Sequence, residues 1–114
     1  MKRPKGANGL VMNALVDIAA LNRQTFDDAE IRRTVIGMFR EQAPVVMAAI
    51  EASEGAARAD AAHRLKGSAL SLGAGPLARA AGALETAPDD AALRHALAAL
   101  LAGTLAALGA IEPG

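Results

Sequence analysis

The sequence predicts an all-α fold, an antiparallel up-down four-helix bundle with an additional short N-terminal helix. The first observation is composition: alanine and leucine dominate a chain of 114 residues that is 53% hydrophobic but only 2% aromatic. Such a mixture, poor in β-branched residues, favours helices over a sheet. The second is that apolar residues recur with a period near 3.6. The third is that short connections separate these segments, which is typical of antiparallel bundles.

The chain is short enough to form one domain. Residues 1–9 carry one proline and two glycines and are expected to be a flexible arm. Residues 10–114 are expected to make up the single domain. Its additional helix is predicted over residues 10–21, with a loop over 22–26.

The long second helix is predicted to begin after Asp27 and to end near Ser53. Asp27 is a suitable N-cap, and Glu30, three residues later, completes a capping-box pattern. Pro44 lies inside this pattern and predicts a kink near residues 40–44.

Short connections separate the remaining helices. Gly73 to Pro76 is a predicted turn, and Asp89 or Asp90 is expected to cap the last helix. Three further helices are predicted, over residues 56–72, 77–86 and 91–111.

Composition excludes several classes of function. The formal net charge is zero, so the chain lacks the basic footprint expected of a nucleic-acid-binding protein. The absence of cysteine excludes disulfides and thiolate metal sites. No run approaches 18 uninterrupted apolar residues, which disfavours a transmembrane span. We therefore expect a soluble cytoplasmic protein without a metal site.

The segment from His63 to Gly73, HRLKGSALSLG, is the most informative part of the sequence. Lys66 and Gly67 follow His63 by three and four residues, so all three share one helix face. Glycine inside a helix costs about 1 kcal/mol relative to alanine, which suggests that a side chain there would obstruct an approaching partner. Histidine is a nucleophile near neutral pH, and a lysine one turn away suits an anion attached to it. The pattern indicates a phosphorylatable histidine on an open face.

A helical wheel separates this face from the core. With His63 at zero and about 100° per residue, five apolar residues cluster on the far side: Ala61, Ala62, Leu65, Ala69 and Leu72. The side chains expected on the histidine face are Gly67, Leu70, Ala59, Ala56 and Lys66. His95, the other histidine, has no such neighbours and is interpreted as a surface residue.

Residues 63–85, HRLKGSALSLGAGPLARAAGALE, resemble the signature of histidine-containing phosphotransfer (HPt) domains, the helical phosphocarriers of two-component phosphorelays. Upstream, the stretch from Met38 to Pro44 is similar to the family's helix ending in F-x-x-x-A-P. The resemblance extends over about residues 10–111. The matching residues are His63, Leu65, Lys66, Gly67, Ser68, Leu72, Gly73, Ala74, Leu77, Leu84 and Glu85.

The resemblance implies that His63 accepts a phosphoryl group at Nε2 from a receiver-domain aspartate and passes it to another response regulator. Lys66 would neutralise the transferred oxygens, and Glu85 would hydrogen-bond to Nδ1 of His63. Receiver domains and a hybrid histidine kinase are the implied partners, with no nucleic acid or membrane involved and the protein a monomer. No cofactor is expected, because the receiver supplies Mg²⁺, and no ATP-dependent kinase activity is implied. The residues expected to dock or orient the partner are Gly67, Leu70, Ala59 and Ser68.

Three alternatives remain at this point. An HPt-like adaptor would bind receiver domains or kinases without being phosphorylated. The phosphoacceptor hairpin of a histidine kinase would carry an acidic residue directly after the histidine, where this chain has Arg64. A purely structural helical protein would require the motif to be coincidental.

Overall fold

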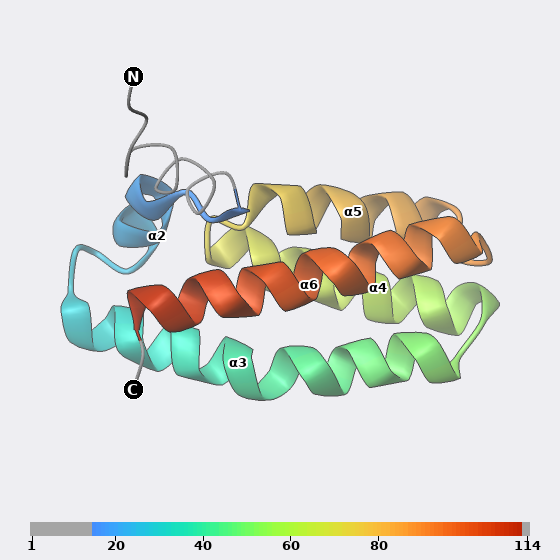
Figure 1. Ribbon diagram of the computed structural model, residues 1–114, viewed down its shortest axis with the longest axis horizontal. Coiled ribbons are helices and arrows are strands. Elements are labelled where there is room, and N and C mark those ends of the chain that lie inside the picture. The colour runs from blue at the N-terminus through green and yellow to red at the C-terminus, as the bar shows by residue number, and fades with distance from the viewer. Residues whose placement is uncertain (1–14, 113–114) are drawn as a thin grey trace, which may run out of the picture.

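The computed structural model describes residues 15–112, and this part of the chain contains five helices and no strand. Helices α3 to α6 run alternately in opposite directions along one axis, and the short helix α2 lies across one end (Figure 1). The all-α bundle is therefore confirmed. The helices are α2 (Ile18–Gln24), α3 (Ala29–Ala52), α4 (Gly55–Ser71), α5 (Gly75–Thr86) and α6 (Ala91–Ile111).

The bounds predicted for the short N-terminal helix are wrong. Helix α2 begins at Ile18 and ends at Gln24, so it crosses the predicted loop over residues 22–26. The reason is a break at Asp17, whose backbone is extended and whose carboxylate accepts the N–H of Ala20 at 3.1 Å. Asp17 thus acts as an N-cap, which satisfies a free donor of the first turn. Residues 10–14 and the predicted arm at 1–9 lie outside the described residues.

The same break ties α2 to the connection between α4 and α5. The N–H of Asp17 donates to the carbonyl of Gly73 at 2.8 Å. Gly73 has a φ of +74°, and a Cβ there would lie 2.7 Å from the carbonyl oxygen of Asp17. Only glycine combines this backbone conformation with so close an approach. The contact fixes the carboxyl end of α4.

The predicted cap of α3 is wrong by one residue. Asp28, not Asp27, accepts the N–H groups of Glu30 and Ile31, at 2.9 and 3.1 Å. Phe26 and Asp27 both have positive φ and complete the turn, so the extended backbone that an N-cap needs comes one residue later.

The other predicted helices agree with the structure to within two residues. Helix α6 has the predicted bounds, with Asp90 as its cap, whereas α5 begins at Gly75 because Pro76 fits its first turn. Helix α3 continues through Pro44 as one helix (Figure 1).

The core consists of aliphatic side chains with alanines between them. Small residues such as Ala62 and Ala81 are fully buried, which lets α4 and α5 pack closely. The largest buried apolar side chains come from all five described helices and from the segment before α2: Val16, Leu21, Ile36, Ile50, Leu65, Leu72, Leu77, Leu84, Leu97 and Leu108.

Arg58 of α4 is a buried charge, only 7% exposed. Its guanidinium donates to the carbonyls of Ile50 and Pro88, both at 2.9 Å, and to that of Ser53. Two of these acceptors end α3, and the third belongs to the connection between α5 and α6. Arg58 therefore satisfies carbonyls left free at a helix end and joins both connections at this end of the bundle.

Helix α6 is the most apolar element. Within the described residues it is the one helix long and apolar enough to cross a membrane, with a mean hydropathy of 1.6 over its most apolar 18 residues. One side of α6 supplies Leu97, Leu101 and Leu108 to the core, and alanines make up much of its exposed side. The buried stripe of leucines and the alanines on the exposed side together account for the apolar composition of α6.

Candidate functional site

Helix α4 presents His63 to solvent by burying its opposite side. Leu65, Ala69 and their neighbours on the predicted core stripe are buried, while the side chain of His63 is 64% exposed. Because the core fixes the rotation of α4, the imidazole is held on the outer face of the helix. This is the arrangement that the helical wheel predicts.

Helix α5 supplies a partner for one nitrogen of the ring. Nδ1 of His63 lies 2.9 Å from Oε2 of Glu85, 22 residues later in the chain. An ionised carboxylate only accepts hydrogen bonds, so Nδ1 carries the proton in this pair. The lone pair of a neutral ring then resides on Nε2, the nitrogen that Glu85 leaves free.

Lys66 contacts the other oxygen of the same carboxylate. Its Nζ lies 3.0 Å from Oε1 of Glu85, so Glu85 bridges the histidine and the lysine. The hydrogen bond from Lys66 lowers the pKa of the Glu85 carboxyl below its usual value, against a smaller opposing effect of desolvation. The hydrogen bond from His63 lowers this pKa further. Glu85 is therefore ionised at neutral pH.

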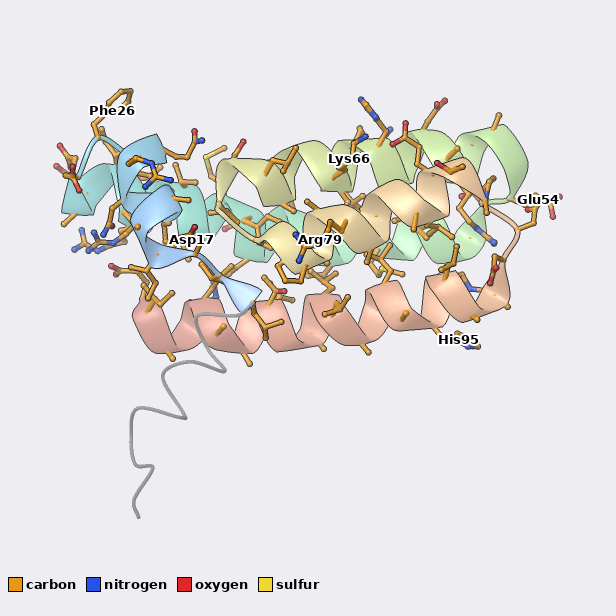
Figure 2. All side chains as sticks on the ribbon, turned by 90° about the horizontal axis from the view of Figure 1, so that it is seen from above. Asp17, Phe26, Glu54, Lys66, Arg79 and His95 are labelled. Carbon is orange, nitrogen blue, oxygen red and sulfur yellow. The ribbon has the colours of Figure 1, made fainter. Side chains whose placement is uncertain are left out.

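Two features of this site did not emerge from the sequence. The Lys66–Glu85 ion pair depends on how α4 and α5 pack, which residue spacing within one helix does not reveal. Gly82, one turn before Glu85, is the second: a Cβ there would lie 3.4 Å from Cδ of Lys66. The lysine stem thus crosses α5 directly over this glycine (Figure 2 labels Lys66). The glycine three residues before the glutamate is the sequence signal of this contact.

We expect acid to break both contacts of Glu85 together. A lowered carboxyl pKa means that these contacts contribute to stability above pH 4.5, the ordinary value, and are lost as the pH falls through the lower folded value. An NMR titration of the Glu85 carboxyl carbon should show a midpoint below 4.5, with the Lys66 Nζ resonances changing over the same range. A midpoint at or above 4.5 would contradict the bridging arrangement.

The face around His63 is open on the side of Gly67. Nothing lies within 4 Å of the position that a Cβ at Gly67 would occupy. Packing inside this chain therefore does not require glycine there. Leu70, the next residue in this row, is 56% exposed, and Ala59, one turn before His63, is half-buried. The predicted row of small and apolar residues thus flanks the imidazole.

Other predicted residues lie away from the imidazole. Ser68 is exposed and lines a groove between α3 and α4 together with Val35 and Met38, which places it beside the groove and not at the ring. His95 is exposed at the first turns of α6 (Figure 2).

The site offers a nucleophilic nitrogen and a cation but no metal ligand set. Among the described residues, no group of three or more His, Asp or Glu side chains is placed to hold a metal ion. Its own residues can accept an electrophile at Nε2 and neutralise negative charge beside it.

Comparison with the families of known proteins found a match over most of the described chain. The family model of the Hpt domain matches residues 30–111, well over half of the chain. The match includes α4 and α5 and so covers His63, Lys66 and Glu85. No curated protein and no solved structure matches the chain.

Proposed function

The chain belongs to the Hpt domain family, and from this premise we propose that His63 accepts a phosphoryl group from a receiver-domain aspartate and passes it to another response regulator. Hpt domains act with receiver domains and kinases in phosphorelays. The observation that carries the proposal is the contact between Nδ1 of His63 and Glu85, which directs the lone pair of Nε2 to solvent.

The geometry supports an in-line transfer. Nε2 attacks the phosphorus of the aspartyl phosphate, the P–N bond forms, and the P–O bond breaks with its electron pair leaving on the aspartate carboxylate. The proton on Nδ1 stays in place, so the ring becomes a phosphoimidazolium. Glu85 stabilises this positive charge through the hydrogen bond that already exists in the unphosphorylated protein.

Lys66 supplies the positive charge for the transferred oxygens. Its ammonium lies on the same face as His63 and is held by Glu85 at 3.0 Å. Pairing with a carboxylate keeps Lys66 ordered before the phosphoryl group arrives, and the flexible stem over Gly82 lets the ammonium shift toward it. Lys66 therefore acts as a charge-neutralising residue next to the nucleophile.

The family to which the chain belongs indicates what the partners supply. The receiver domain supplies the Mg²⁺ and the acidic residues that hold it, so this chain needs no cofactor of its own. We further propose that it works in the cytoplasm as a monomer, that a hybrid histidine kinase carries the donor receiver, and that Gly67 leaves room for the receiver's loops. The protein is then a covalent carrier without ATP-dependent kinase activity.

The test is transfer from a phosphorylated receiver domain. Receivers carrying radiolabelled aspartyl phosphate should label the wild type and the His95→Gln variant, and His63→Gln should carry no label. Addition of a second, unphosphorylated receiver should then remove the label from the wild type. Retention of label by His63→Gln would place the acceptor elsewhere, and binding of receivers without any labelling would favour the adaptor.

A further inference from the structure

The turn between α2 and α3 holds an aromatic residue in an unfavourable backbone conformation. Phe26 has a φ of +58° and Asp27 a φ of +54°, both in the left-handed region. Residues other than glycine, asparagine and aspartate are uncommon in this region, and a bulky residue there is an outlier. Asp27 is suited to its position, whereas Phe26 is not.

Hydrogen bonds on both sides fix this conformation. The N–H of Asp27 donates to the carbonyl of Asn22 at 2.8 Å, and the N–H of Asp28 donates to that of Thr25 at 2.9 Å. Thr25 is itself buried, and its hydroxyl donates to the carbonyl of Leu21 at 2.9 Å. The backbone therefore fixes the direction of the Cα–Cβ bond of Phe26.

Packing within this chain does not account for the phenylalanine. Its side chain is 80% exposed, the highest exposure among the large hydrophobic residues of the described chain. An asparagine would fit the backbone better, and little buried apolar surface would be lost because most of Phe26 is exposed. A strained and exposed aromatic residue in an over-determined turn indicates a role outside the folded chain.

The side chain of Phe26 projects on the same side of the bundle as Lys66 (Figure 2). Exposed apolar residues lie between the turn and the phosphotransfer site. Leu70 follows His63 by seven residues, about 10 Å along the helix axis. Met38 of α3 is 53% exposed and lines the groove beside α4. Leu70 lines a separate hollow together with Asp17 and Ala20, so the row that begins at His63 reaches the start of α2.

The expected size of an interface between this chain and a receiver domain indicates that the contact reaches the end of the bundle at which α2 lies. A typical stable interface covers about 800 Å² on each partner, which corresponds to a disc of about 16 Å radius. A receiver centred over His63 would therefore reach beyond the carboxyl end of α4, where α2 is attached through Asp17 and Gly73.

We propose that Phe26 is an anchor for the receiver domain, inserting into an apolar pocket on the partner and contributing to the choice of partner without touching the reacting atoms. The inference rests on the proposed function. Aromatic residues contribute strongly to binding energies at interfaces, and a turn whose backbone is already fixed loses little backbone freedom on binding. Phe26 acts on association, whereas His63, Lys66 and Glu85 act on the chemical step.

The decisive variant is Phe26→Asn, because relief of strain should raise its thermal stability while loss of the anchor should weaken its binding to the receiver. Relief of the left-handed strain should raise the Tm by about 4–8 °C. Loss of the anchor should lower kcat/KM for transfer from a receiver that charges the wild type by about tenfold or more, through KM, with the rate at saturating receiver unchanged. Phe26→Tyr should restore kcat/KM to within about threefold of the wild type.

Phosphoramidate, a donor that needs no docking surface, separates the two proposals. It should label His63 at equal rates in the wild type and in Phe26→Asn. A raised Tm with unchanged transfer would contradict the proposal that Phe26 is an anchor. A fall in the transfer rate at saturating receiver would also contradict it. So would a wild-type dimer that Phe26→Asn dissociates without any effect on transfer. A wild type that phosphoramidate labels but no receiver charges would contradict the proposed function itself.

Discussion

Gly67→Gln is expected to make the protein more stable and nearly inactive in transfer from a receiver. No atom lies within 4 Å of the added Cβ, so the chain itself accommodates the side chain. Replacing glycine in a helix interior by glutamine should increase the free energy of unfolding by about 0.5–1 kcal/mol. The same side chain stands one turn from the imidazole, where a partner must approach. We expect kcat/KM to fall by about 100-fold, equivalent to about 2.7 kcal/mol.

The matched control is Gly37→Gln. Gly37 also lies inside a helix, is exposed and has nothing within 4 Å of its Cβ position, but it belongs to α3. The free energy of unfolding of Gly37→Gln should rise by the same amount as that of Gly67→Gln, and phosphoryl transfer to this variant should be unaffected. Urea denaturation and initial rates of labelling measure the two effects. Undiminished transfer in Gly67→Gln would show that the open face around His63 does not serve docking.

Arg58→Met is expected to cause the largest loss of stability. The variant keeps most of the apolar stem but leaves the carbonyls of Ile50, Ser53 and Pro88 without their donor. Hydrogen bonds from a charged donor contribute about 1.5–3 kcal/mol each, and part of the loss is recovered because water reaches the two connections. A decrease of about 3 kcal/mol in the free energy of unfolding follows.

Arg64→Met provides the comparison for this loss. Arg64 is on the same helix and carries the same charge, but it is exposed. Its substitution should change the free energy of unfolding by less than about 0.5 kcal/mol. Equal denaturation midpoints for the two variants would show that the Arg58 hydrogen bonds do not stabilise the bundle.

Local signals in the sequence predict the long helices well. The bounds of α6 follow from Asp90 and the apolar period, and Pro76 marks the first turn of α5. The errors fall where a tertiary contact decides the structure. The break at Asp17 depends on its hydrogen bond to Gly73, and the shift of the α3 cap depends on a turn in which Phe26 adopts a conformation that its residue type disfavours.

The residues of the site also divide into those that local sequence signals predict and those that tertiary packing determines. The position of His63 opposite the core follows from the helical period, and Lys66 and Gly67 follow from their spacing within α4. The family resemblance alone predicts the contact of Glu85 with His63. The sequence does not predict the bridge to Lys66, because the packing of α4 against α5 determines it. Ser68 matches the family signature, but a rotation of about 140° around the helix separates it from His63.

The most direct measurement of the central claim is the position of the phosphoryl group on the ring. The protein labelled with ¹⁵N-histidine should be phosphorylated by a receiver and recorded by ¹⁵N and ³¹P NMR. We predict ³¹P coupling to Nε2 of His63, with Nδ1 keeping the proton that it shares with Glu85. Coupling to Nδ1 of His63, or to either nitrogen of His95, would contradict the account.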